Sequence, residues 1–326
     1  MKQLKQCSAT NCSRVVHTVK QDSLESYSKR DAVWDGHRGD CEDVADIYAT
    51  DEDFTRYAER MGDCSGFLTF GWADNHETGE SSLKLRKASF CRVRHCPVCQ
   101  WRRSLMWQAR FYQALPDLVE KHPSARWIFL TLTVKNCPVE DLRTTVQDMN
   151  RAWHRMVKRK TFAPVLGWVR TTEVTLGADG SAHPHFHALL MVPQSMLGGS
   201  QYVKQSQWVE LWQSCARLDY TPVVDVRAVR AKVGSAKGAL ESAISETLKY
   251  SVKPSDMVRH EGWFLEMTRQ VHKLRFIATG GALKDVLRVD DEQEEDLLVQ
   301  DAESEGLDEA LLGFSWRPSQ RKYRRA

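Results

Sequence analysis

The sequence has 326 residues, of which 42% are hydrophobic and 27% are charged. These values match soluble globular proteins, and they exclude fibrous, collagen-like and wholly disordered chains. No stretch approaches the roughly 18 consecutive apolar residues of a membrane-spanning helix, and the first residues lack the apolar core of a signal peptide. We therefore expect a cytoplasmic protein without a membrane partner.

Charge is distributed unevenly along the chain. The net charge is +3 overall, but it is −4 over residues 1–63, +13 over residues 64–289 and −6 over residues 290–326. A basic central region attracts polyanions, so nucleic acid is the first partner to consider. The nine cysteines indicate metal binding or catalysis rather than a disulfide framework, because a reducing cytosol keeps thiols free.

The residue pattern of the N-terminal third of the chain changes at about residue 60, from a polar segment to one with strand and helix periodicity. The first 60 residues are rich in Ser, Asp and charge without a sustained apolar period, which predicts a variable, mostly disordered or loosely helical lead-in. Short runs at 66–72 and 81–94 predict a hairpin that leads into a cysteine-rich segment. The apolar spacing of residues 105–115 predicts a helix that stops at Pro116.

The middle of the chain alternates between strand and helix patterns. Strands are predicted at 126–134, 165–176, 183–192 and 222–230, and helices at 138–160, 205–217 and 236–252. This order predicts an α+β fold with a central antiparallel sheet and helices on one face. After Leu287, an acidic block followed by a basic one predicts a flexible tail.

Three histidines mark the strongest candidate site. His183, His185 and His187 alternate along a predicted strand, so their imidazoles share one face. A hairpin centred on Asp179 places Glu173 opposite His185, within reach of a shared ion. Imidazoles and a carboxylate suit Mg²⁺ or Mn²⁺ and would also accept Zn²⁺. The alternatives are histidines paired with carboxylates or facing solvent, and a Glu173 turned away by a register slip.

A second candidate group lies on the predicted helix 236–252. Glu246 and Tyr250 are four residues apart and therefore share a face, with Lys249 and Lys253 beside them as candidate DNA contacts. A phenol activated by a metal and by ammonium groups can attack a phosphate and form a covalent link. Alone, such a pair is more often a packed aromatic and a solvated acid, so the catalytic interpretation depends on the histidines.

A third group is the cysteine cluster. Cys91, Cys96 and Cys99 follow the spacing Cys-x4-Cys-x2-Cys, and Cys64 lies 27 residues upstream. This spacing predicts a structural Zn²⁺ site, with His95 as a reserve ligand. The alternative is a set of buried reduced thiols or a redox pair. The remaining cysteines are predicted to be ordinary thiols: Cys7, Cys12, Cys41, Cys137 and Cys215.

Arginines surround the cysteine cluster and are interleaved with tryptophans. Arg92, Arg94, Arg102 and Arg103 are candidate contacts to DNA phosphates and bases. Each of them could instead belong to a solvated helix face.

Together these motifs resemble the plasmid rolling-circle replication initiators of the HUH endonuclease superfamily, in the class with one catalytic tyrosine and a glutamate one turn before it. The resemblance rests on FLTLTV at 129–134, HPHFHALL at 183–190, KYSVK at 249–253 and the cysteine-rich stretch at 90–104. It covers about residues 60–287.

The resemblance implies a metal-dependent nicking reaction. His185 and His187 would hold a catalytic Mn²⁺ or Mg²⁺, with Glu173 or His183 as the third ligand. Tyr250 would attack one phosphodiester of the double-strand origin, keep the 5′ phosphate and release a 3′ hydroxyl as primer.

The resemblance also implies a late step and further partners. Glu246 would activate water to cut the regenerated origin at termination, so that one tyrosine suffices. The host helicase and DNA polymerase are expected partners, in addition to plasmid origin DNA. The predicted division of the chain is a variable lead-in at 1–60, a cysteine-rich zinc-binding and DNA-contact segment at 61–115, an HUH nicking domain at 116–287 and a flexible tail at 288–326.

Two alternatives to this function stay open. Another HUH enzyme, a relaxase or a transposase, would share the histidines and the tyrosine, although in relaxases the nucleophile precedes the histidines. A non-enzymatic, zinc-dependent DNA-binding regulator would use the cysteines alone and would bind DNA without cleaving it.

Overall fold

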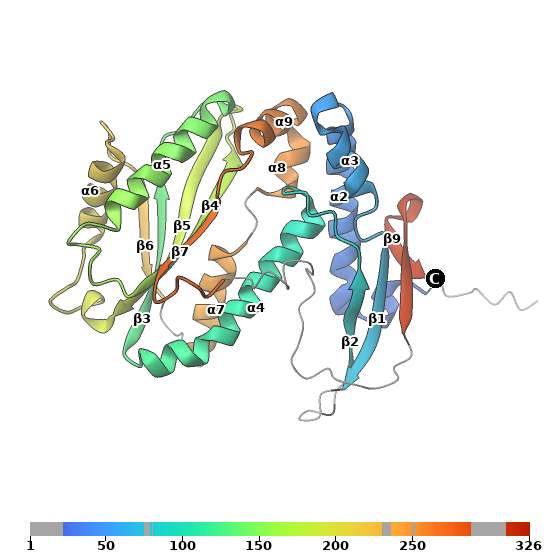
Figure 1. Cartoon of the computed structure of the whole chain (residues 1–326), viewed down its shortest axis with the longest axis horizontal. Helices are drawn as coiled ribbons and strands as arrows, with labels where there is room; N and C mark the ends of the chain where they lie inside the picture. Colours follow the sequence, from blue (N-terminus) through green and yellow to red (C-terminus); the bar gives the residue numbers. More distant parts are fainter. Residues whose placement is uncertain (1–21, 75–78, 80, 230–235, 250–251, 288–310) are drawn as a thin grey trace, which may run out of the picture.

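The computed structural model describes residues 22–74, 79, 81–229, 236–249, 252–287 and 311–326. The helices are α1 Leu24–Tyr27, α2 Val33–Ala49, α3 Thr55–Gly62, α4 Pro97–Lys121, α5 Leu142–Met156, α6 Gln205–Ala216, α7 Ala236–Thr247, α8 Pro254–Arg259 and α9 Glu261–Gln270. The strands are β1 Phe67–Asp74, β2 Ser81–Ala88, β3 Ala125–Thr133, β4 Gly167–Leu176, β5 Ala182–Pro193, β6 Val224–Ala228, β7 Ile277–Gly281, β8 Leu312–Arg317 and β9 Lys322–Arg325. Within these ranges the chain forms two antiparallel sheets flanked by helices (Figure 1), which confirms the predicted α+β class.

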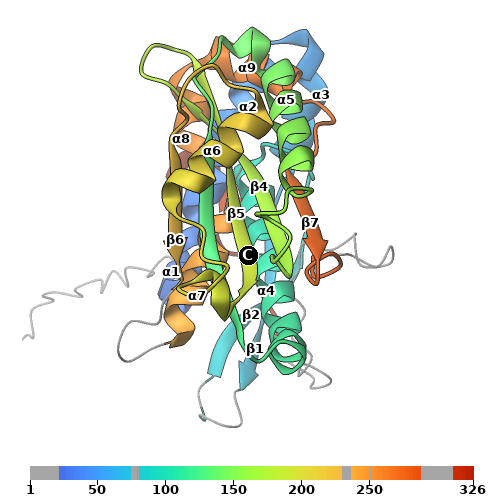
Figure 2. The ribbon, with the colours of Figure 1, turned by 90° about the vertical axis from the view of Figure 1, so that its left-hand side faces the viewer.

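The larger sheet has the strand order β6-β3-β5-β4-β7, and its neighbouring strands are all antiparallel. The strands and helices that the sequence predicts between residues 126 and 252 lie in or beside this sheet, at nearly the predicted positions. β5 lies at the centre, and its residues are buried along almost the whole strand. Figure 2 shows α5 and α6 in front of this sheet.

Helices cover both faces of the larger sheet, so the prediction of helices on one face is wrong. Phe186 of β5 packs with Trp153 and Trp212 of α5 and α6. On the opposite face, Leu189 packs with residues of α4 and α7, including Ile244. The second half of β5, from Ala188 onward, is apolar on both faces and therefore requires cover on both.

Helix α4 continues past the proline at which it was predicted to stop. Pro116 lies inside the helix, which ends at Lys121. An internal proline costs about 3 kcal/mol because it removes a backbone hydrogen bond. Phe111 and Leu118, on either side of it, are buried against the larger sheet, and each such side chain stabilises the helix by roughly 1.5–3 kcal/mol.

The predicted lead-in is folded over residues 22–60, which corrects the sequence-based expectation for that part. Helix α2 buries Trp34, Cys41, Val44 and Tyr48 against the smaller sheet and against α4. These residues recur at helical spacing, but the many acidic residues between them obscure the pattern. Residues 1–21 lie outside the described part of the chain.

The last residues of the chain are also folded, so the prediction of a flexible tail is wrong for residues 311–326. Strands β8 and β9 complete the smaller sheet, whose order is β2-β1-β8-β9. Phe314, Trp316 and Tyr323 are buried there beneath α2. A short apolar segment of this kind is stable only because β1 is there to pair with it. Residues 288–310 fall outside the described ranges.

Among the described helices, none is both long and apolar enough to cross a membrane.

Candidate active site

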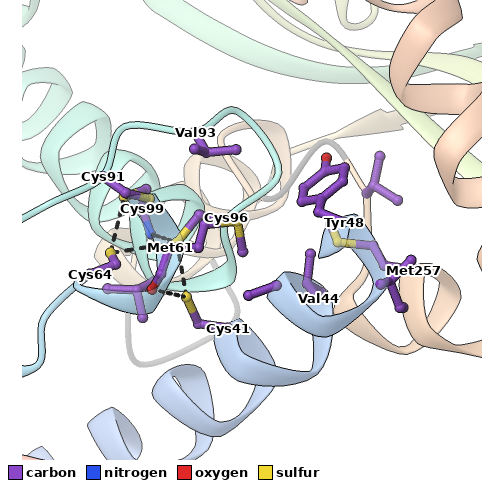
Figure 3. Close-up of a cluster of buried hydrophobic side chains, with 14 of the residues drawn as sticks. Cys41, Val44, Tyr48, Met61, Cys64, Cys91, Val93, Cys96, Cys99 and Met257 are labelled. Atoms are coloured by element: carbon purple, nitrogen blue, oxygen red, sulfur yellow. Dashed lines mark hydrogen bonds between the residues drawn. The ribbon is translucent and has the colours of Figure 1, made fainter. Parts of the chain in front are cut away.

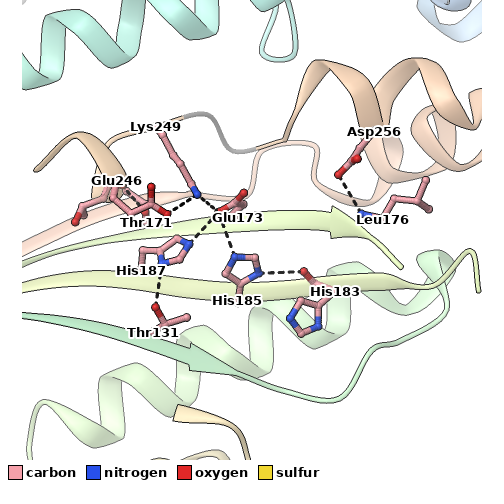
Figure 4. Close-up of polar contacts among 11 residues, drawn as sticks. Thr131, Thr171, Glu173, Leu176, His183, His185, His187, Glu246, Lys249 and Asp256 are labelled. Atoms are coloured by element: carbon pink, nitrogen blue, oxygen red, sulfur yellow. Dashed lines mark hydrogen bonds and ion pairs between the residues drawn. The ribbon is translucent and has the colours of Figure 1, made fainter. Parts of the chain in front are cut away.

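The hairpin β4–β5 brings three potential metal ligands together. Glu173 lies directly opposite His185, and Thr171 lies opposite His187, so the predicted register is confirmed. Glu173 Oε2 is 3.2 Å from His185 Nε2 and 2.9 Å from His187 Nε2. One donor atom from each of the three residues therefore converges on a common point (Figure 4). We call Glu173, His185 and His187 the triad.

The orientation of the two imidazoles fits a metal. His185 Nδ1 lies 3.3 Å from the backbone oxygen of His183, which can only accept a hydrogen bond. Nδ1 must therefore carry a proton, which leaves Nε2, the nitrogen on the side of Glu173, as the atom that could bind a metal ion. His187 Nδ1 is held by the hydroxyl of Thr131 at 3.2 Å. In known metal sites, hydrogen bonds of this kind to the second ring nitrogen hold the imidazole in the orientation that metal binding requires.

His183 does not join the triad, although it was a candidate third ligand. Its Nδ1 lies 2.6 Å from Asn136 Oδ1, and the residue is half-buried at the edge of the site. Burial lowers the pKa of His183, and neighbouring His185 lowers it further. The same residue contributes its backbone oxygen to His185, so its role in the structure is one of support.

Electrostatics keep the carboxylate of the triad charged. Burial alone would raise the pKa of Glu173, but its close contacts with the two imidazoles and the charge of Lys249 outweigh this effect, so the pKa lies well below its usual range. Lys249 Nζ lies 3.1 Å from Glu173 Oε2 and 2.6 Å from Glu246 Oε1. Burial lowers the pKa of Lys249, yet the two carboxylates raise it above its ordinary value overall.

The chain just before Tyr250 is attached to the site at three points. Thr171 Oγ1 donates a hydrogen bond of 2.7 Å to the backbone oxygen of Thr247. Ser104 Oγ donates one of 2.6 Å to the backbone oxygen of Leu248. Lys249 then contacts the triad as described above. These contacts, which sequence reasoning missed, come from two elements far away in the chain.

Helix α7 is shorter than predicted. It ends at Thr247 instead of residue 252, and the carbonyls of Thr247 and Leu248 accept hydrogen bonds from side chains of β4 and α4. Glu246 lies in its last turn with an exposed side chain. Tyr250, the predicted nucleophile, lies outside the described residues, so its predicted position on the same helical face as Glu246 stays a prediction.

The four predicted cysteines converge at a second site in the smaller half (Figure 3). Cys64 Sγ lies 3.6 Å from Cys96 Sγ and 3.7 Å from Cys99 Sγ, and Cys91 Sγ lies 3.6 Å from Cys99 Sγ. A fifth sulfur, that of Cys41 on α2, lies 3.5 Å from Cys96 Sγ. Sequence reasoning treated Cys41 as an ordinary thiol, because it is 55 residues from Cys96.

The donor chemistry of this cluster fits a structural Zn²⁺. Cys64, Cys91, Cys96 and Cys99 are all buried. Hydrogen bonds from the neighbouring thiols lower the pKa of Cys99, whereas burial raises that of Cys96. A divalent cation would allow all four to be thiolates, because its charge offsets both burial and mutual repulsion.

His95, the reserve zinc ligand, does not join the cysteine cluster. It is fully buried with its ring against Phe264, at a centroid distance of 5.9 Å. Burial lowers its pKa to about 3. We therefore assign His95 to the apolar core.

The candidate DNA-contacting side chains divide into structural and accessible ones. Arg102 is buried between Trp34 and Trp101, with its guanidinium 5.4 Å from each ring centroid, so its prediction as a DNA contact is wrong. Arg94 donates hydrogen bonds to two backbone oxygens near α9 and is half-buried. Arg92 and Lys253 are exposed.

Comparison with known proteins gives an independent result. A family model described as "Replication protein" matches residues 82–324. The chain is 32% identical to "Protein rep" of Bacillus amyloliquefaciens over 337 aligned residues, which cover 94% of this chain and 97% of the relative. It is 33% identical to "Protein rep" of Streptococcus pneumoniae over 262 residues, or 79% of each chain.

A further relative is matched over a shorter region. The chain is 36% identical to "Protein rep" of Lentilactobacillus hilgardii over 206 residues, which cover 63% of this chain and 64% of the relative. No solved structure matches the chain. The family match covers most of the sequence and includes both candidate metal sites except Cys64. The chain therefore belongs to the replication protein family, in agreement with its resemblance to plasmid rolling-circle initiators.

Proposed function

We propose that this protein initiates rolling-circle replication of a plasmid by nicking one strand of the double-strand origin. The observation that carries the proposal is the convergence of Glu173, His185 and His187 beside residues 247–249, which lead directly into Tyr250. A metal-binding group and a potential nucleophile that adjoin in this way are what a phosphotyrosyl transfer requires.

In the proposed nicking step, the phenolic oxygen of Tyr250 attacks the scissile phosphorus. A new bond joins this oxygen to phosphorus, and the bond from phosphorus to the 3′ oxygen breaks. The phenol loses a proton and the leaving oxygen gains one. The products are a 5′ phosphotyrosyl link and a 3′ hydroxyl. A host helicase then separates the strands, and the host DNA polymerase extends the 3′ hydroxyl as its primer.

The charged groups around the triad support this step. A Mn²⁺ or Mg²⁺ held by Glu173, His185 and His187 would withdraw negative charge from the phosphate. The ammonium of Lys249 lies against the same carboxylate and would stabilise the charge that develops on the phosphate oxygens. Thr131 holds His187 in its orientation throughout.

Glu246 is assigned to termination. Its side chain is exposed in the last turn of α7 and contacts Lys249, which also contacts the triad. In the proposed second cleavage, Glu246 accepts a proton from a water molecule whose oxygen attacks the scissile phosphorus of the regenerated origin, while the bond from phosphorus to the 3′ oxygen breaks and this oxygen gains a proton. The 3′ hydroxyl formed in this way attacks the phosphotyrosyl phosphorus, which closes the released circle and frees the phenol of Tyr250. The single Tyr250 would then suffice for a complete cycle.

The cysteine cluster has a structural role in the proposal. A Zn²⁺ held by Cys64, Cys91, Cys96 and Cys99 would join α4 to the smaller sheet. Through Ser104, α4 in turn holds the backbone at Leu248 beside the triad. In this proposal residues 61–115 contact DNA and residues 116–287 carry out nicking.

The proposal is tested with supercoiled DNA that carries the double-strand origin, incubated with the protein and Mn²⁺. We expect a covalent protein–DNA adduct on a denaturing gel, and we expect Tyr250→Phe to abolish it. Tyr202→Phe, which alters an exposed tyrosine outside the site, serves as the control. DNA binding without an adduct under any divalent metal would contradict nicking and would favour a zinc-dependent DNA-binding regulator.

A second experiment tests the division of labour between the two steps. We expect Glu246→Ala to nick the origin but to fail in releasing closed single-stranded circles. Glu241→Ala, which removes another carboxylate from α7, should perform both steps. An equal loss of nicking and release in Glu246→Ala would contradict the role assigned to this residue.

A further inference from the structure

A basic pocket adjoins the triad, and of its lining residues only Lys249 has a part in the proposed nicking step. Its volume is about 400 Å³, and it lies where α4, β4 and the start of β7 meet. Figure 1 shows α4 between the two sheets, so the pocket lies at the junction of the two halves of the molecule. This volume is in the range of small-ligand sites in proteins.

The lining of the pocket combines positive charge with aromatic rings. The cationic side chains are Arg92, Arg94, Arg103, Lys249 and Arg275. No carboxylate is among the described residues that line it. Such a surface favours an anionic ligand.

The aromatic residues of the pocket are Trp107 and Phe276. The guanidinium of Arg94 lies 5.0 Å from the centroid of Phe276 and is fixed by hydrogen bonds of 2.8 and 2.6 Å to the backbone oxygens of Val271 and Leu274. The planar guanidinium of Arg94 is therefore held in a fixed position on this side of the pocket. The half-buried Trp107 supplies the indole surface. Planar bases stack on indole rings and on guanidinium groups.

The pocket adjoins the triad through two residues. Lys249 lines the pocket and also lies 3.1 Å from Glu173. Thr171 lines it as well and pairs across the strands with His187. A ligand in this pocket would therefore be a direct neighbour of a phosphate bound at the triad.

From these observations we infer that the pocket holds one unpaired nucleotide of the origin strand, next to the scissile phosphate. Its base stacks on Trp107, and Arg103 and its neighbours contact the flanking phosphates. Only a base displaced from the duplex can enter such a cavity, so the pocket favours single-stranded over paired DNA. The inference rests on the proposed function for the identity of the adjoining phosphate.

The test compares two fluorescein-labelled probes, a single-stranded dT 15-mer and a 15-mer of the same backbone without bases. Binding is measured by fluorescence anisotropy with zinc-loaded protein and without added Mn²⁺ or Mg²⁺, so that cleavage does not contribute and the cysteine cluster keeps its metal. We expect Trp107→Ala to weaken binding of the dT probe about tenfold and to leave binding of the base-free probe unchanged. Trp107→Phe, which keeps a ring, should restore part of the loss and shows that the fold is intact.

Arg103→Ala should weaken binding of both probes and lower the slope of log affinity against log salt by about 0.7, as expected for one lost phosphate contact. Trp72→Ala, which removes an exposed indole from β1 outside the pocket, is the matched control and should leave the difference between the probes unchanged.

Equal effects of Trp107→Ala on both probes, or no effect on either, would overturn the inference. The outcome is separate from that of the nicking experiment. Loss of base-dependent binding in Trp107→Ala without any adduct in the wild type would support the pocket and reject nicking. An adduct that depends on Tyr250, with unaltered probe binding in Trp107→Ala, would support nicking and reject the nucleotide pocket.

Discussion

The two candidate metal sites differ in how their ligands are distributed along the chain. The triad belongs to a single hairpin, and Glu173 is 12 and 14 residues from its two histidines. The cysteine cluster joins the segment after α3, the segment after β2 and the start of α4, and Cys99 lies 35 positions after Cys64. The triad is assembled by strand register, whereas the cysteines meet only when several elements pack. Loss of the triad should therefore affect chemistry, and loss of the cysteine cluster should affect folding.

The largest effect is expected at the cysteine cluster. Cys99→Ser should abolish zinc binding and lower the melting temperature by on the order of 10 °C, because a structural metal contributes directly to folding free energy. Zinc analysis and thermal unfolding measure both quantities. Cys41→Ser should keep its zinc, since this sulfur lies beside Cys96 outside the four-ligand group. Full zinc content in Cys99→Ser would contradict the four-cysteine assignment, and loss of zinc in Cys41→Ser would make Cys41 a ligand.

The triad should respond in the opposite way. His187→Ala should lower the rate of adduct formation by about 10³-fold, because a metal contributes several kcal/mol of charge stabilisation to such a step. Its melting temperature should change little. His183→Ala, on the same strand but outside the triad, should lose less than about tenfold. Equal losses in the two variants would show that His183 is a ligand in solution.

Two arginines near the cysteine cluster should differ in their effects on stability and on DNA affinity, and the expected effects are smaller than those above. Arg102→Ala should destabilise the fold by about 2 kcal/mol, because it removes a buried cation from between two indoles. DNA affinity of the folded protein should be unchanged. Arg92→Ala, at an exposed position, should leave stability unchanged and weaken DNA binding. Denaturant unfolding and anisotropy separate the two effects, and a reversed pattern would contradict the structural role of Arg102.

The smallest effect concerns pH. The pKa of Glu173 is lowered on folding, so its carboxylate stabilises the fold above the unfolded-state value of 4.5. This contribution decreases as the pH falls below 4.5 toward the folded-state pKa. In metal-free protein, Glu173→Gln should therefore be less stable than the wild type at pH 7, with a difference that shrinks below pH 4.5. Urea unfolding at several pH values measures it, and a difference that grows in acid would contradict the lowered pKa.

The candidate site was predictable from the sequence where it depends on local geometry. Alternation along β5 and the turn at Asp179 were sufficient to place Glu173 opposite His185, because side chains in a strand repeat every two residues. The same reasoning could not separate His183 from the triad, since that choice depends on Asn136 beyond the end of β3. The end of α7 was missed as well, because no local pattern shows that hydroxyls of β4 and α4 donate hydrogen bonds to the backbone carbonyls of Thr247 and Leu248.

Sequence patterns predicted the α+β class, strands β3 to β6 of the larger sheet, the register of the β4–β5 hairpin and the grouping of four cysteines. These features follow from short-range periodicity and from ligand spacing, which are written in neighbouring residues. Tertiary packing was needed to show that α2 and the last strands are folded, that Cys41 adjoins the four-cysteine group and that Arg102 is buried. Each of these depends on contacts between residues far apart in the chain, and whether a side chain is buried or exposed is a property of its partners as much as of its own segment.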